Sequence, residues 1–75
     1  MTKLPALTGE QVIKALGKIG FQELRRRGSH VYLKHVDGRA TVVPVHKGET
    51  VGPGLFRKMI RDSELSREEF IVLVR

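Results

Sequence analysis

Apolar residues recur at helical spacing in the first quarter of the chain. The repeating positions are Val12, Leu16 and Ile19. Side chains three or four positions apart lie on one face of a helix, so this pattern predicts an amphipathic helix. Thr8 and Gln11 have the spacing of a capping box, in which each side chain accepts a hydrogen bond from a free backbone N–H at the helix start. We therefore predict a helix from about Gly9 to Ile19.

The middle of the chain changes to the alternation that is typical of strands. Phe21 to Arg26 alternates imperfectly and predicts a short first strand. The segments Val31 to Val36 and Arg39 to Val45 flank Asp37 and Gly38, a dipeptide that readily forms the two-residue turn of a hairpin. The sequence therefore predicts three strands, the last two joined by this turn.

A two-residue turn at Asp37 and Gly38 also predicts which residues pair. The expected pairs are Val36 with Arg39, Leu33 with Val42, and Val31 with Pro44. Paired residues share a face of the sheet. The face toward the helices would carry Val31, Leu33, Ala40 and Val42. The opposite face would carry His30, Tyr32, Lys34, Thr41, Val43 and Val45. Because this opposite face mixes polar, aromatic and apolar groups, we expect it to bind a partner.

Two further helices are predicted in the last third of the chain. Pro53 suits the first turn of a helix, and the inward-facing residues after it would be Leu55, Phe56, Met59 and Ile60. Ser66 and Glu69 repeat the capping-box spacing and predict a short C-terminal helix. The order of helix, three strands, helix and short helix predicts one α+β domain over residues 1–75.

Charge and composition narrow the class of partner. The 75 residues include 14 Lys and Arg against 8 Asp and Glu, a net charge of +6 that favours nucleic acid. The chain has no cysteine, which excludes disulfides and fits a reducing compartment. Met1 to Leu7 lacks the apolar stretch of a signal peptide, and no segment is long enough to span a membrane. We expect a soluble, cytoplasmic protein.

One cluster of residues suggests chemistry. Three successive arginines, Arg25, Arg26 and Arg27, come directly before Gly28, Ser29 and His30. Arginine side chains can hold phosphate close to the imidazole. Histidine transfers protons near neutral pH, and RNA cleavage needs one proton removed from a 2′-hydroxyl and another delivered to the departing 5′-oxygen. Alternatively, His30 only orders the turn through a hydrogen bond.

These residues, with others along nearly the whole chain, resemble the HicA toxin family. The similar segments are Gly20 and Phe21, Gly28 to His30, Val42 to His46, Gly54 to Ile60, and Leu65 to Phe70. The resemblance implies a fold like that of a double-stranded-RNA-binding domain, cleavage of RNA, and neutralisation by a HicB antitoxin. It also implies that His30, in the Gly, Ser, His motif, is the catalytic histidine.

The expected function is therefore that of a type II toxin, an endoribonuclease acting on mRNA. A single histidine, His30, would supply metal-independent acid or base catalysis, with the 2′-hydroxyl of the substrate as nucleophile. The spacing of His30, His35 and His46 matches no compact metal signature, so we expect no metal or other cofactor. The alternative is a noncatalytic RNA-binding or protein-interaction module of the same fold.

Two groups of contact residues are expected around His30. RNA contacts are expected from Arg25, Arg26, Arg27, Ser29, Lys34 and Lys47. Contacts with the antitoxin are expected from Tyr32, Val43 and Val45. Tyr32 could also stack on a base, although a single aromatic residue favours cross-strand packing. An antitoxin that covers this basic surface would block both chemistry and attraction of the substrate.

Overall fold

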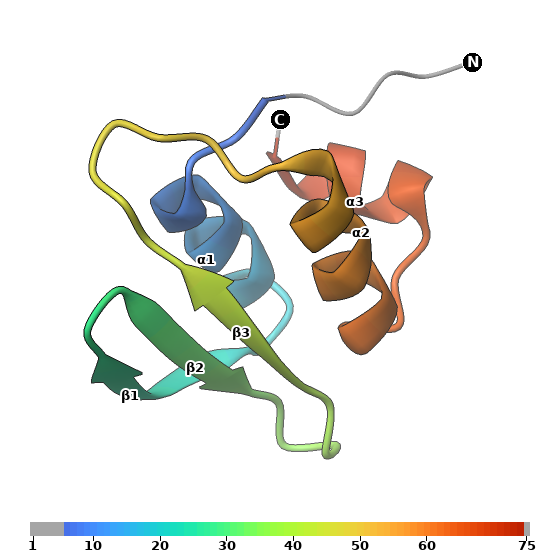
Figure 1. The fold of residues 1–75 in the computed structure, drawn as a ribbon. Helices are drawn as coiled ribbons and strands as arrows, with labels where there is room; N and C mark the ends of the chain where they lie inside the picture. The colour runs from blue at the N-terminus through green and yellow to red at the C-terminus, as the bar shows by residue number, and fades with distance from the viewer. Residues whose placement is uncertain (1–5, 75) are drawn as a thin grey trace.

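The computed structural model describes residues 6–74, which form a three-stranded antiparallel sheet and three helices (Figure 1). The elements are α1 (Gly9–Gly17), β1 (Gln22–Arg27), β2 (His30–Lys34), β3 (Ala40–Pro44), α2 (Pro53–Asp62) and α3 (Arg67–Val74). The strand order is β1-β2-β3. The predicted α+β class is confirmed, and the arrangement is consistent with that of a double-stranded-RNA-binding domain.

Helix α1 begins at the predicted capping box. The backbone N–H of Gln11 donates to Thr8 Oγ1 (3.2 Å), and the backbone N–H of Thr8 donates to Gln11 Oε1 (2.9 Å). The helix ends at Gly17, two residues before the predicted end. The N–H groups of Lys18 and Ile19 bond to carbonyl groups three residues earlier, so the last turn is tighter than an α-helix.

The register of the β2–β3 hairpin differs by one residue from the prediction. Val31 pairs with Val43, and Leu33 pairs with Thr41. The reason is the length of the turn. The N–H of His35 donates to the carbonyl oxygen of Arg39 (2.8 Å), which leaves three loop residues in place of two. The third of these, Gly38, has a φ of +102°, as expected for the glycine of a three-residue hairpin loop.

This shift exchanges the two faces of β3. Thr41 and Val43 are buried toward the helices, whereas Ala40 is exposed and Val42 is half-buried on the other face. The prediction that Ala40 and Val42 face the helices is therefore wrong. The faces of β2 are as predicted, with Val31 and Leu33 buried.

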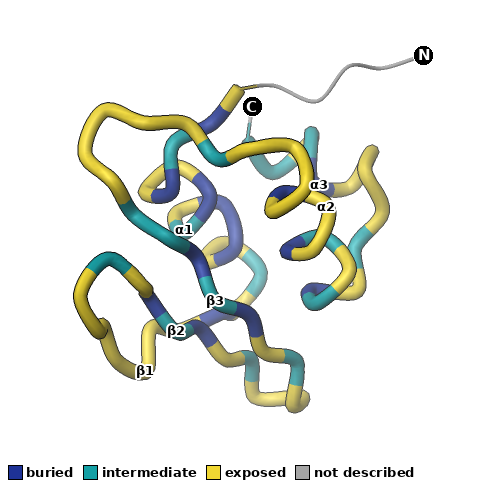
Figure 2. Tube along the Cα trace, viewed as in Figure 1, coloured by how far each residue is buried: buried dark blue, intermediate teal, exposed yellow. Residues whose placement is uncertain are grey.

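The hydrophobic core lies between one face of the sheet and the helices (Figure 2). Its buried members are Leu7, Val12, Ala15, Leu16, Phe21, Val31, Leu33, Val43, Phe56, Met59 and Phe70. Phe56 of α2 and Phe70 of α3 meet edge to face, with ring centroids 5.0 Å apart. Leu55, which was expected to point inward, is exposed. Every helix within residues 6–74 is too short or too polar to serve as a membrane span.

The C-terminal helices also begin as predicted. Pro53 occupies the first turn of α2. Ser66 and Glu69 form a second capping box, with Glu69 N–H to Ser66 Oγ at 3.0 Å and Ser66 N–H to Glu69 Oε1 at 2.8 Å. Buried Thr41 would otherwise hold an unpaired hydroxyl in the core, but it donates to Asp62 Oδ2 of α2 (3.1 Å). This bond ties α2 to β3.

The turn between β2 and β3 contains a carboxylate, Asp37, whose ionised form stabilises the fold. The pKa of Asp37 lies below its ordinary value, chiefly because the backbone N–H of Arg39 donates to its carboxylate. A carboxylate with a lowered pKa in the folded state stabilises the fold above its ordinary pKa, and this contribution is lost as the pH falls through the lowered value. We therefore expect Asp37→Asn to melt at a lower temperature than the parent at pH 7. Between pH 7 and pH 3, the melting temperature of the variant should fall by less than that of the parent. Glu68→Gln, at an exposed carboxylate of α3, is the control. The same pH dependence in parent and Asp37→Asn would contradict this role.

Candidate nucleic-acid interface and catalytic histidine

A tight turn between β1 and β2 positions His30. Arg27 pairs with His30, so Gly28 and Ser29 are the two loop residues. Gly28 has a φ of +59° and occupies the loop position at which type II′ hairpin turns carry glycine. The carbonyl oxygen of Ser29 accepts a hydrogen bond of 2.6 Å from the N–H of Val45, just beyond β3. This bond links the turn between β1 and β2 to the residue after β3. His30, directly after the turn, is exposed.

The face of the sheet turned away from the helices carries the predicted site. On β2 it holds His30, Tyr32 and Lys34. Their partners on β1 are Arg27, Arg25 and Gln22, and their partners on β3 are Pro44, Val42 and Ala40. Paired residues share a face, so these nine residues define what we call the open sheet face. Its cationic groups come mainly from β1, on one side of His30.

The structure separates the three arginines. Arg25 and Arg27 belong to the open sheet face. Arg26 pairs with buried Val31 and therefore projects to the other side, where its Nη2 lies 3.5 Å from Glu23 Oε1. Only two arginines of the run are thus brought to the face of His30. The sequence predicted one role for all three because a run of identical residues does not show which side each occupies.

Tyr32 is half-buried and is covered in part by Arg25. The guanidinium carbon of Arg25 lies 4.8 Å from the centroid of the Tyr32 ring, which is a cation–π contact. Val42 lies opposite on β3. The packing role favoured from the sequence is therefore present in the structure, and it fixes the position of Arg25 on the open sheet face.

The remaining contact residues lie in different settings. Lys34, at the far end of β2, and Lys47, in the loop after β3, are both exposed. Val45 is partly buried against the core, so the expectation that it lies on the open sheet face is wrong. Val43 is fully buried. The expectation that Val43 lies on the open sheet face is wrong because of the one-residue register shift, and Val43 presents no surface to a partner.

His35 has a structural position, away from the open sheet face. Its Nε2 lies 2.8 Å from the carbonyl oxygen of Ile19, and its Nδ1 accepts from the N–H of Asp37 (3.1 Å). Its ring packs edge-on against Phe21 with centroids 5.3 Å apart. A Cβ at Gly20 would lie 2.8 Å from this ring, so the loop after α1 needs glycine here. His35 thus holds the hairpin turn against α1.

Arg39, which sequence reasoning gave no role, fixes the same turn from the other side. Its Nε donates to Asp37 Oδ2 (2.8 Å), and its Nη1 donates to the carbonyl oxygen of Ser63 (2.6 Å). This basic residue serves the fold and contributes little to the open sheet face. Among residues 6–74, no three histidine or carboxylate side chains are grouped so that they could hold a metal ion.

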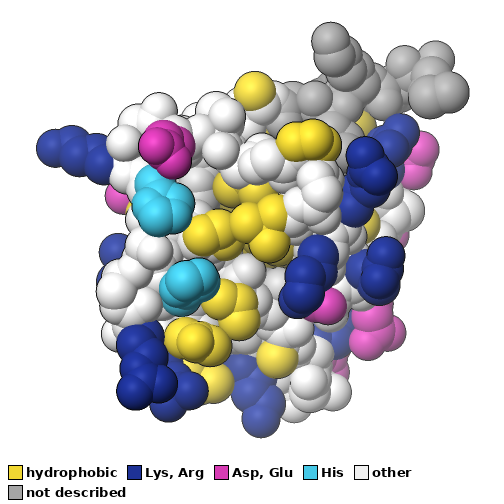
Figure 3. Space-filling model, viewed as in Figure 1, with side chains coloured by type: hydrophobic (Ala, Val, Ile, Leu, Met, Phe, Trp, Pro, Cys, Tyr) yellow, Lys and Arg dark blue, Asp and Glu magenta, His cyan; other side chains and the backbone are white. Residues whose placement is uncertain are grey.

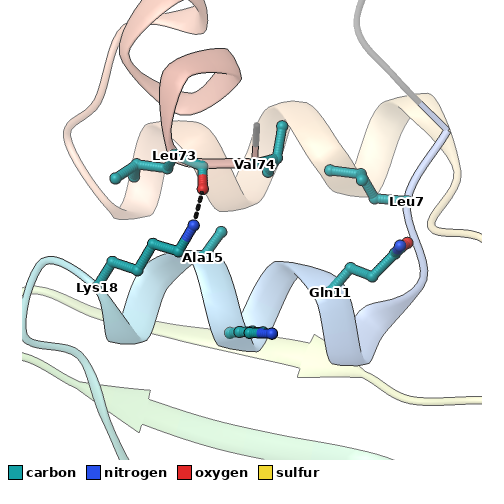
Figure 4. Close-up of a pocket in the computed structure, with 7 residues that line it drawn as sticks. Leu7, Gln11, Ala15, Lys18, Leu73 and Val74 are labelled. Carbon is teal, nitrogen blue, oxygen red and sulfur yellow. Dashed lines mark hydrogen bonds between the residues drawn. The ribbon is translucent and has the colours of Figure 1, made fainter.

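A hollow of about 240 Å³ between α1 and α3 lies on the helical side of the molecule (Figure 4). Lys18 crosses one end of it, where its Nζ donates to the carbonyl oxygen of Leu73 (2.7 Å). Leu7, Ala15 and Val74 supply apolar walls. This lining contains no histidine, so the open sheet face is the better candidate for acid–base chemistry.

A three-stranded sheet, covered by helices on one face and carrying an exposed histidine at its first turn, defines a small α+β protein with an open basic face. A family model described as HicA toxin of bacterial toxin–antitoxin matches residues 9–65 of the 75-residue chain. The chain therefore belongs to the HicA toxin family, which supports a toxin role and pairing with an antitoxin. The matched segment spans α1 to the end of α2 and includes the whole open sheet face. No curated protein matches the chain.

The backbone of Gly28 is a direct test of the site geometry. Space around this glycine is open, so alanine would meet no neighbour, yet its φ of +59° is costly for any residue with a Cβ. We expect Gly28→Ala to lower the free energy of unfolding by about 1–2 kcal/mol. Gly17→Ala, at a helix end with equally open surroundings, should be neutral or stabilise by less than about 1 kcal/mol. Urea unfolding followed by circular dichroism measures both, and equal effects would contradict this view of the turn.

Proposed function

We propose that this chain is an endoribonuclease toxin that cleaves mRNA with His30 as a proton-transfer residue. The observation that carries the proposal is the position of His30. It is exposed at the start of β2, pairs with Arg27, and shares the open sheet face with Arg25. An imidazole beside two guanidinium groups suits a substrate whose reacting centre is a phosphodiester.

The proposed reaction is transesterification within the RNA strand. The 2′-oxygen loses its proton and attacks the adjacent phosphorus, and the bond from phosphorus to the 5′-oxygen breaks. The 5′-oxygen takes up a proton as it leaves. The products are a 2′,3′-cyclic phosphate and a 5′-hydroxyl end. His30 performs one of the two proton transfers, and the nucleophile belongs to the RNA, so DNA is not cleaved.

The basic residues of the site position the RNA backbone. Arg25 and Arg27 contact phosphates next to the scissile bond. Lys34, at the end of β2, and Lys47, in the loop after β3, extend the basic surface. Ser29 lies in the turn directly before His30, where it can contact the RNA. Arg26 faces the other side of β1 and contributes to long-range attraction of RNA only.

The antitoxin partner is a HicB-like protein that covers the open sheet face in the cytoplasm, where both proteins would meet mRNA. Tyr32 is the residue of the predicted partner set that stays on the open sheet face and is partly accessible. Val45 is also partly exposed, but its side chain packs against the core. A partner with acidic groups opposite Arg25 and Arg27 would exclude RNA and hide His30.

Substitution of His30 tests the catalytic role. We expect the parent to cleave a single-stranded RNA in the presence of a chelator, and we expect His30→Ala to reduce the rate by about 10²–10⁴-fold, the range typical of lost acid or base catalysis. Because His30 is exposed, the variant should keep the circular dichroism spectrum and melting temperature of the parent. Arg67→Ala, on the surface of α3, is the control for loss of a basic group.

Two outcomes would overturn this function. Unchanged cleavage by folded His30→Ala would remove His30 from the reaction. RNA binding without cleavage by the parent, across RNAs of varied sequence, would favour the noncatalytic binding module of the same fold.

The separation of the arginines by face gives a second test. Arg25→Gln, Arg26→Gln and Arg27→Gln each remove one positive charge. If Arg25 and Arg27 contact phosphate, each loss should reduce the slope of log affinity against log salt by about 0.7 for a single strand, whereas Arg26→Gln should change it little. Binding to a 2′-O-methyl RNA, which cannot be cleaved, measures the slope by fluorescence anisotropy at several salt concentrations. Equal slopes for all three variants would contradict the assignment.

A further inference from the structure

A second histidine lies on the same side of the molecule as His30. Pro44 pairs directly with His30 across β2 and β3. The hydrogen bond from Val45 N–H to Ser29 O continues the pairing one residue beyond β3, and the Val45 side chain packs against the core. With Val45 turned inward, the alternation of an extended chain turns the next residue, His46, outward. His46 is exposed, as His30 is.

The surface beside His46 is hollowed. Pro44 and His46 line one hollow of about 250 Å³, together with Glu49, Thr50 and Leu55. Figure 3 shows two histidine side chains on one face, with apolar side chains between and beside them and Lys and Arg gathered mainly at the edges. The hollow extends from Pro44 away from the arginines of β1, because Pro44 belongs to the opposite edge strand.

The proposed reaction requires two proton transfers on opposite sides of one phosphorus. In an in-line displacement, the attacking 2′-oxygen and the departing 5′-oxygen lie on opposite sides of the phosphorus, so one imidazole cannot easily serve both at once. In an antiparallel pair, a residue and the residue two positions beyond its partner are separated by roughly 7–8 Å, within reach of long or aromatic side chains. His46 stands two positions beyond Pro44, the partner of His30, and lies just outside β3. Two imidazoles at this spacing can flank a phosphate.

We propose that His46 is the second proton-transfer residue, and that His30 and His46 act as an acid and base pair on either side of the scissile phosphate. This inference rests on the proposed function. One neutral imidazole takes the proton of the 2′-hydroxyl as the new bond from the 2′-oxygen to phosphorus forms. The other, as imidazolium, gives a proton to the 5′-oxygen as its bond to phosphorus breaks. The net reaction uses no oxidant or reductant. The hollow beside His46 holds part of one of the two nucleosides that flank the phosphate.

The test uses a substrate that needs no acid. A cleavage site for the parent is first mapped in an RNA, and that linkage is then prepared with either oxygen or sulfur at the bridging 5′ position. A thiolate leaves without protonation, so loss of the general acid slows cleavage of the oxygen substrate and not of the sulfur substrate. His30→Ala and His46→Ala are each assayed on both substrates in chelator, with Arg67→Ala as the surface control and circular dichroism as the check on folding.

If one histidine is the acid and the other the base, the two variants should respond differently to sulfur. Each variant should cleave the oxygen substrate about 10²–10⁴-fold more slowly than the parent. Sulfur should restore the rate of one variant to near that of the parent and leave the other slow. The pH–rate profile of the parent should be bell-shaped, and each variant should lose one of its two limbs.

Other results overturn the proposal in distinguishable ways. Parent-like cleavage by His46→Ala removes His46 from the reaction and leaves the role of His30 intact. Equal slowing of His46→Ala on both substrates, with both pH limbs kept, assigns His46 to binding and not to proton transfer. Absence of cleavage by the parent overturns the proposed function itself.

Discussion

The one-sided burial of the sheet is the constraint on which the rest of the structure depends. Val31, Leu33 and Val43 are buried against the helices, and side chains alternate along each strand. Burial of Val31 and Leu33 therefore obliges His30 and Tyr32 to face outward. The helices lie on the buried side only, as the packing of α1 and α2 on β3 shows. Stability and exposure of the candidate site follow from the same alternation.

The two hairpin turns determine which residues lie beside His30. Gly28 closes a two-residue turn that places Arg27 beside His30. Gly38 ends a three-residue turn that sets β3 so that Pro44 lies opposite His30. If the second turn were one residue shorter, Val43 would leave the core, and the residues beside His30 would change. Positive φ at two glycines thus determines what surrounds the imidazole.

Much of the fold could be predicted from local sequence, because the signals involved are local. The capping boxes at Thr8 and Ser66 and the outward position of His30 depend on residues a few positions apart. The register of β3 could not be predicted, since Asp37 and Gly38 suit turns of two or three residues. The three-residue turn is also held by contacts between residues distant in sequence. One is the hydrogen bond from Arg39 to the carbonyl oxygen of Ser63, 24 positions away. The hollow shared by Pro44 and His46 also involves α2, which no local pattern reveals.

The proposed function places RNA across the open sheet face, at the turn that carries His30. The most direct measurement is a titration of the ¹⁵N-labelled protein with a 2′-O-methyl RNA, followed by amide chemical shifts. The largest changes should fall on the first hairpin turn and on the outward residues Arg25, Arg27 and His30. Changes confined to α1 and α3, with the first hairpin unaffected, would contradict the claim.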